Sequence, residues 1–132
     1  MKNKVLVDTS VWVEFFRHRS EPGRLVEDLL MGHAVWTCGM VMFEILKGIR
    51  LEEEKTRVLQ LLEILPYVEM TKALWLRASE LSTDLRREGV TLPNSDLFIA
   101  AIALGHNLSV FTLDHHFKQI PSLKLYEPLS WT

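Results

Sequence analysis

The sequence predicts an α/β domain with a central, mostly parallel sheet of four to five strands flanked by helices. Two short apolar runs, at residues 4–7 and 110–113, are rich in β-branched residues, and each is followed by an aspartate. Apolar runs of this length are typical of strands that are buried on both faces of a sheet. Segments with helical periodicity separate the strand candidates, and such crossovers join parallel strands while covering both faces.

Capping residues and periodicity define the other elements. Ser20 and Thr71 are typical of helix starts, and residues 93–95 supply another start. Gly89 and Gly105 are expected to follow helix ends. Weaker strand candidates lie at residues 34–38 and 67–70, and a last strand is expected at 123–126. The expected helices span residues 10–18, 21–31, 39–50, 52–64, 71–88 and 94–105.

Length and composition indicate one domain covering residues 1–132. Of the 132 residues, 48% are hydrophobic, which is enough apolar material for a core. Cys38 is the single cysteine, which excludes an internal disulfide and favours a reducing cytoplasm. The longest apolar runs are interrupted within about ten residues, whereas a membrane-spanning helix needs roughly 20. We therefore expect a cytoplasmic protein without a membrane or targeting segment.

The charge balance bears on whether the protein contacts nucleic acid. A net charge of −2 is unusual for such a protein, because phosphate contacts favour a basic surface. Trp12, Trp36 and Trp75 could stack on bases, but their apolar neighbours favour positions in the core. Six basic residues are expected, as a group, to surround the functional site: Arg17, Arg19, Lys47, Arg50, Arg86 and Arg87.

Four acidic residues lie within or directly after apolar segments: Asp8, Glu44, Asp96 and Asp114. A buried carboxylate costs free energy unless it is protonated, paired or bound to a metal. Asp8 and Asp114 follow strands, and Asp96 lies in the first turn of a helix that precedes a strand. Glu44 lies about one and a half turns into a helix that leaves the same sheet edge. Ligands of open α/β sheets bind outside the carboxyl ends of the strands, so the sequence predicts one acidic pocket.

Each acid also has a structural interpretation when it is taken alone. An aspartate after a strand is usually a turn or capping residue, and Asp96 would also favour the dipole of its helix. Thr9, Ser10 and Thr112 could orient the carboxylates, although hydroxyls at strand ends more often cap helices. His115 and His116 could bind metal or phosphate, but adjacent side chains point in different directions, so surface positions are favoured.

The order of four motifs carries a family resemblance. The motifs are Val7-Asp8-Thr9-Ser10-Val11-Trp12, Glu44-Ile45-Leu46-Lys47-Gly48, the helix from Asp96 to Ala103, and Thr112-Leu113-Asp114-His115-His116-Phe117. In this order and over the whole chain, the sequence resembles PIN-domain ribonucleases of the VapC toxin type. The family often has an aspartate where His116 stands, so a fifth acid is either missing from this chain or not required.

The resemblance implies a single PIN domain with a PIN-like fold and the activity of an endoribonuclease. Carboxylates would hold Mg²⁺ or Mn²⁺, with Asp8 and Asp96 as the primary ligands. Asp114 would complete the first metal site or bridge to a second, and Glu44 would hold a second ion or orient the attacking water. Because water attacks rather than the 2′-OH, the cut RNA would carry a 5′-phosphate.

The resemblance also implies partners. A cognate VapB-like antitoxin is expected to inhibit by inserting an Arg or Lys side chain among Asp8, Glu44, Asp96 and Asp114. A homodimer is expected, with Trp12, Met40 and Met42 on helices whose apolar surface exceeds what one small sheet covers. The alternative is a catalytically silent PIN-like scaffold that binds a protein or RNA partner.

Two other enzyme and signalling classes do not fit these residues. A response-regulator receiver needs a phosphorylatable aspartate after its central strand, and residues 67–71 offer none. A haloacid-dehalogenase-type phosphatase needs a second aspartate two residues after the first, where this chain has Ser10.

Overall fold

The computed structural model describes residues 3–17 and 20–128, and it confirms the predicted α/β class. Four parallel strands form the sheet in the order β3-β2-β1-β4. The strands are β1 (Val5–Val7), β2 (Val35–Cys38), β3 (Tyr67–Val68) and β4 (Ser109–Phe111). All three residues of β1 are buried, as expected for a central strand covered on both faces.

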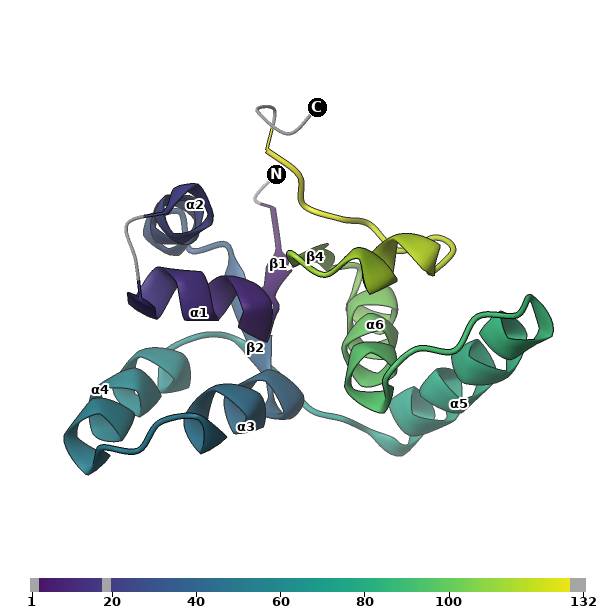
Figure 1. The fold of residues 1–132 in the computed structure, drawn as a ribbon, viewed down its shortest axis with the longest axis horizontal. Helices are drawn as coiled ribbons and strands as arrows, with labels where there is room; N and C mark the ends of the chain where they lie inside the picture. Colours follow the sequence, from purple (N-terminus) through teal and green to yellow (C-terminus); the bar gives the residue numbers. More distant parts are fainter. Residues whose placement is uncertain (1–2, 18–19, 129–132) are drawn as a thin grey trace.

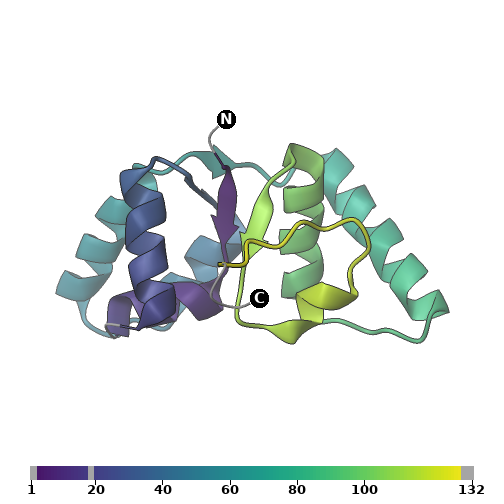
Figure 2. The ribbon, with the colours of Figure 1, turned by 90° about the horizontal axis from the view of Figure 1, so that it is seen from above.

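Helices cover both faces of the sheet. They are α1 (Thr9–Arg17), α2 (Glu21–Met31), α3 (Gly39–Lys47), α4 (Glu52–Glu63), α5 (Lys72–Arg87) and α6 (Asn94–His106), followed by the short 3₁₀ helix η1 (His115–Gln119). Figures 1 and 2 show α1, α2 and α4 on one side of the sheet and α5 and α6 on the other. Helix α1 packs against α2, and α5 packs against α6.

The predicted helix starts are confirmed, whereas one predicted helix end is wrong. The Ser20 hydroxyl accepts a hydrogen bond from the Gly23 N–H, and the Thr71 hydroxyl accepts one from the Leu74 N–H. Gly105 lies inside α6, which ends at Asn107 in the left-handed conformation, with φ of 54°. A Cβ at Gly105 would come within 2.6 Å of Leu74 Cδ2, so this glycine permits the close approach of α5 and α6.

Two other sequence-based expectations need adjustment. The predicted last strand forms a single parallel bridge between Val110 and Leu125 at the edge of β4. Trp12 is fully buried as predicted, but the core position expected for Trp75 is wrong, because half of its surface is exposed. Residue 18, the expected end of the first helix, lies outside the described residues. No helix within the described ranges is long and apolar enough to cross a membrane.

The strand order creates a switch point between β1 and β4. The chain runs from β1 through β2 to β3 by way of α1 to α4, and then returns across the opposite face through α5 and α6 to β4. The connection that leaves β1 and the connection that enters the neighbouring strand β4 therefore lie on different faces, and ligand sites of open α/β sheets lie at the carboxyl ends of strands at such a point. Asp8 and Thr112 each follow one of these two strands directly.

Candidate active site

Asp8 is held at the carboxyl end of β1 by hydroxyl groups. Its backbone N–H donates to the Phe111 carbonyl over 2.9 Å, which continues the pairing of β1 with β4. Ser10 Oγ and Thr112 Oγ1 both donate to Asp8 Oδ2, over 2.9 and 2.8 Å. Only 7% of Asp8 is exposed, and these donors offset part of the cost of burying a carboxylate. The two hydroxyls thus fix the orientation of Asp8.

Asp96 and Asp114 meet at the imidazole ring of His116. Asp96 lies in the first turn of α6, and Asp114 precedes η1, where its Oδ1 accepts a hydrogen bond from the His116 N–H over 3.0 Å. The ring atom His116 Nδ1 is 3.0 Å from Asp96 Oδ2 and 3.0 Å from Asp114 Oδ1. One oxygen from each carboxylate and one nitrogen from the ring lie within 4.8 Å of one another.

The raised pKa of Asp96 indicates that a negative charge at this position is energetically unfavourable. Burial raises the pKa most, since Asp96 is only 8% exposed, and the nearby carboxylates of Asp114 and Asp8 raise it further. The hydrogen bond with His116 acts in the opposite direction. Thr112 Oγ1 donates to Asp8 and accepts from the Asp114 N–H, so Asp8 lies beside this pair of carboxylates.

Glu44 approaches Asp8 from α3. It is half-buried, and Thr9 at the start of α1 donates to Glu44 Oε1 over 3.1 Å. The buried Cys38 thiol lies near both Asp8 and Glu44, because each carboxylate adds to the rise in its pKa that burial causes. Thr9 directly follows Asp8 in the chain, so its hydrogen bond brings Glu44 close to Asp8.

Sequence reasoning underestimated His116 and the three hydroxyl residues. The His116 side chain is 46% exposed, in keeping with the favoured surface position, but its ring also contacts two of the predicted site residues. The sequence signal that could have indicated this contact was the position of His116, two residues after Asp114, where PIN-domain ribonucleases of the VapC type often have an acid. Thr9, Ser10 and Thr112 donate to carboxylates, so the orienting interpretation holds for all of them.

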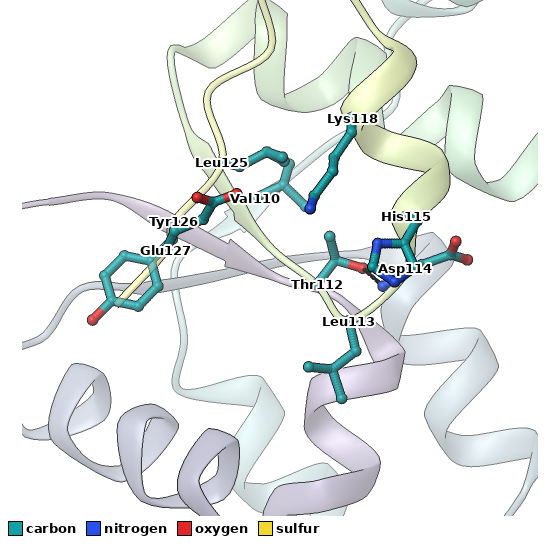
Figure 3. Close-up of a pocket in the computed structure, with 9 residues that line it drawn as sticks. All are labelled: Val110, Thr112, Leu113, Asp114, His115, Lys118, Leu125, Tyr126 and Glu127. Carbon is teal, nitrogen blue, oxygen red and sulfur yellow. Dashed lines mark hydrogen bonds between the residues drawn. The ribbon is translucent and has the colours of Figure 1, made fainter. Parts of the chain in front are cut away.

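A cavity of about 340 Å³ adjoins Asp114. It lies between the end of β4, η1 and the segment that bridges to β4, and Thr112 and Asp114 line it. Figure 3 shows the Lys118 side chain extending from η1 toward Val110 in this cavity. The complete lining is Val110, Thr112, Leu113, Asp114, His115, Lys118, Leu125, Tyr126 and Glu127.

The basic residues that were expected to surround the functional site lie only partly within the described residues. Arg17 lines a groove together with Glu44, which places it near the site. Arg87 instead pairs with Asp84 on the exposed surface of α5, at 3.7 Å, where such a pair contributes little to stability. Arg19 lies outside the described residues.

The side chains present fit a divalent cation. Carboxylate oxygens are the ligands that Mg²⁺ and Mn²⁺ prefer, and an imidazole nitrogen suits transition metals. A cation would also offset the charge that raises the pKa of Asp96. The acidic cluster is therefore compatible with metal binding.

Comparison with known proteins identifies the family. The model of the PIN domain family matches residues 5–123. Ribonuclease VapC1 of Methanocaldococcus jannaschii is 30% identical over 130 residues, covering 96% of this chain and 89% of the relative. Ribonuclease VapC11 of Mycobacterium tuberculosis is 31% identical over 121 residues, covering 88% of this chain and 90% of the relative. The chain belongs to the PIN domain family and, within it, to the VapC ribonucleases.

Solved structures share the fold. DNA-bound VapBC from Salmonella typhimurium superposes with a TM-score of 0.81 at 18% identity, covering 94% of this chain and 97% of the other. VapBC2 from Rickettsia felis, bound to a promoter DNA fragment, has a TM-score of 0.78 at 24% identity and covers 92% of this chain and 96% of the other. At these identities the similarity establishes the common architecture.

Removing the charge of Asp96 is expected to stabilise the protein when divalent ions are absent. The folded pKa of Asp96 lies above its unfolded value of about 3.9, so ionisation costs more in the folded state. This cost is absent well below pH 3.9 and fully present above the folded pKa. At pH 7 in a chelator, Asp96→Asn should raise the melting temperature by roughly a few degrees.

The gain in melting temperature should shrink as the pH is lowered toward 4. Asp84→Asn is the matched control, because Asp84 is exposed and its removal should change the melting temperature little. A lower melting temperature for Asp96→Asn at pH 7 would contradict the electrostatic account.

Proposed function

We propose that this VapC-family ribonuclease is a toxin that hydrolyses RNA phosphodiester bonds with the help of Mg²⁺ or Mn²⁺. The observation that supports the proposal is the cluster of Asp96, Asp114 and His116 at the switch point of the sheet, to which Thr112 links Asp8. The described relatives of similar length are named ribonucleases, which supports RNA as the substrate. The free thiol of Cys38 supports a reducing, cytoplasmic location.

The four carboxylates would divide two tasks, which are holding the metal ions and orienting the attacking water. Asp8 and Asp96 are proposed as the primary metal ligands, and Asp114 completes the site or bridges to a second ion. Glu44 is proposed either to hold that second ion or to orient the attacking water and accept its proton. A divalent cation, when bound, activates water and offsets the charge of the phosphodiester.

The hydroxyl residues would keep the carboxylates in position for this reaction. Ser10 and Thr112 fix Asp8, and Thr9 fixes Glu44. Thr112 also links Asp8 to Asp114, because its Oγ1 accepts a hydrogen bond from the Asp114 N–H over 3.0 Å. Partners that orient metal ligands typically contribute 10–100-fold to metal affinity or activity.

The cavity beside Asp114 offers a path for the RNA strand. Lys118 and His115 line it, so a phosphate next to the scissile one would meet a basic side chain. The overall charge of −2 is compatible with this arrangement, since cations bound at the carboxylates offset the negative charge of the site. A silent scaffold is the alternative, and the complete set of four acids argues for the enzyme.

Loss of Asp8 is expected to abolish cleavage without unfolding the protein. Asp8→Asn and Asp96→Asn each remove a ligand charge while keeping the side-chain shape, so RNA cleavage should fall by more than the 10–100-fold typical of an orienting partner. Asp114→Asn should weaken cleavage less, and Ser10→Ala should cost about 10–100-fold. Cleavage of a labelled RNA and the circular dichroism of each variant are the measurements.

Asp28→Asn on the exposed surface of α2 is the matched control and should cleave at the wild-type rate. An Asp8→Asn protein that cleaves as fast as the wild type would refute the assignment of Asp8. If the wild type binds metal but neither it nor any variant cleaves RNA, the scaffold alternative is supported.

An apolar groove that leads to Glu44 supports control by an antitoxin. A groove of about 300 Å³ lies between α1, α3 and the start of α4. Several solved structures with this fold are VapBC complexes, and we propose that a cognate VapB-like antitoxin lays an apolar segment here. Glu44 lines the groove, so an adjacent Arg or Lys of the antitoxin would reach the carboxylates. The lining residues are Val13, Phe16, Arg17, Glu44, Ile45, Gly48, Ile49 and Glu54.

Divalent ions and the antitoxin are therefore expected to compete. Raising Mg²⁺ or Mn²⁺ should weaken binding of the antitoxin to the wild type, because a cation and a guanidinium relieve the same carboxylates. The effect should be much smaller in an Asp8→Asn, Asp96→Asn double variant. Calorimetry that finds affinity independent of metal in both proteins would exclude this mode of inhibition.

A second apolar groove supports a homodimer. This groove of about 380 Å³ lies between α3, α5, α6 and the end of β3. Phe43, Trp75 and Tyr67 line it while remaining 58%, 50% and 46% exposed. Large aromatic side chains gathered in this way are typical of protein interfaces, and we propose a second copy of the chain as the partner. Met40 lines the groove, whereas Trp12 is buried in the core and cannot contribute.

The free protein is expected to be a dimer at tens of micromolar, and Phe43→Glu should make it monomeric because it places a charge in the apolar groove. Light scattering measures the mass directly. Met31→Glu is the control, since Met31 is 76% exposed on α2, away from the groove, and this variant should remain a dimer. A strictly monomeric wild type at this concentration would reject the dimer.

A further inference from the structure

The position of His116 carries an inference about which metal the site prefers. We propose that His116 Nδ1 is a direct ligand of the cation held by Asp96 and Asp114, and that this nitrogen makes the site prefer Mn²⁺ to Mg²⁺. The inference rests on the proposed metal-dependent function. It concerns a residue at which this chain departs from the acid that is common in the family.

The distances around Nδ1 match those between neighbouring metal ligands. Two ligands at right angles around an ion, with bonds of about 2.1 Å, are about 3.0 Å apart. His116 Nδ1 is 3.0 Å from Asp96 Oδ2 and 3.0 Å from Asp114 Oδ1. All three atoms lie within 4.8 Å of one another. The same contacts also suit an N–H donor shared by two carboxylates, so the experiment must separate a ligand from a hydrogen-bond donor.

The backbone holds the His116 ring in this place. The His116 N–H donates to Asp114 Oδ1, and the Asp114 N–H donates to Thr112 Oγ1, each over 3.0 Å. The next residue, Phe117, is 1% exposed and anchors η1 in the core. His116 is therefore fixed from both sides along the chain, although its ring reaches the surface. A fixed ligand loses little conformational entropy when it binds an ion.

The chemistry of an imidazole nitrogen then favours Mn²⁺. Mg²⁺ is a hard ion that selects oxygen ligands and keeps several waters, whereas imidazole suits transition metals. A neutral nitrogen also leaves two negative charges on Asp96 and Asp114, where a third carboxylate would add another. The lower charge weakens the binding of both ions, whereas the nitrogen ligand weakens Mg²⁺ binding more than Mn²⁺ binding. The nature of residue 116 thus sets the metal preference.

Pulsed electron paramagnetic resonance of Mn²⁺ added to the full-length protein tests the inference without measuring activity. Nitrogen-14 modulation of the Mn²⁺ echo, at the coupling typical of a bound imidazole, is expected in the wild type. It should disappear in His116→Ala and His116→Asp and remain in the neighbouring variant His115→Ala. Bound Mn²⁺ without nitrogen modulation in the wild type would overturn the proposal, and so would modulation that persists in His116→Ala.

Calorimetry with Mg²⁺ and Mn²⁺ tests the preference separately. The ratio of the Mg²⁺ to the Mn²⁺ dissociation constant should fall at least about tenfold in His116→Asp, in line with the effect of ligand environment on metal affinity. An unchanged ratio would overturn the preference. A wild-type echo without nitrogen modulation rejects the ligand by itself, and two different substitutions of His116 guard against one variant that fails to fold.

Failure of this proposal is distinguishable from failure of the proposed function. Metal-dependent RNA cleavage without a nitrogen signal would remove His116 as a ligand and leave the nuclease intact. A wild type that binds neither Mn²⁺ nor Mg²⁺ would overturn both.

Discussion

The structure depends on holding several carboxylates close together where their negative charges repel one another. Two unit charges at 4 Å interact by about 4 kcal/mol at an effective dielectric constant near 20, so an uncompensated group of this kind opposes folding. The raised pKa of Asp96, which burial and the carboxylates of Asp114 and Asp8 cause, is the local sign of that cost. A functional site that costs stability is a common compromise in enzymes.

The sheet topology brings the carboxylates together, and hydrogen bonds offset part of the free-energy cost of their repulsion. Because β1 and β4 are neighbours whose connections leave on opposite faces, residues more than a hundred positions apart meet at one sheet edge. Hydroxyl donors then orient two of the carboxylates, with Ser10 and Thr112 on Asp8 and Thr9 on Glu44. Glu44 lies where the carboxylates meet the groove between α1 and α3. One group of charges can thus serve a metal, an RNA phosphate or a basic side chain of an inhibitor.

The parts of this arrangement that topology dictates were predictable from the sequence. The buried apolar runs before Asp8 and Asp114 indicated parallel strands, and parallel strands bring their carboxyl ends to one edge. The helices likewise followed from periodicity and from caps such as Ser20 and Thr71. Contacts that depend on side-chain rotamers were not predictable. The ring of His116 faces two carboxylates because η1 turns it inward, and no periodicity encodes that turn.

The hydrophobic pattern of the sequence also left the solvent exposure of individual side chains undetermined. Trp75 has apolar neighbours in the sequence, yet half of its surface is exposed in the groove between α3, α5 and α6. Gly105 was expected to end a helix, but it lies within α6, where close packing against Leu74 requires a residue without a side chain. In both cases the packing between α5 and α6, rather than the local sequence, decides the outcome.

The most direct test of the central claim is the chemistry of the cut RNA ends. If the carboxylates hold a cation that activates water, metal-stripped protein should leave RNA intact, and added Mn²⁺ or Mg²⁺ should produce fragments that carry a 5′-phosphate. End-group analysis of the fragments by mass spectrometry distinguishes this product from the alternative. Cleavage that persists in a chelator, or fragments that end in a 2′,3′-cyclic phosphate, would contradict the account.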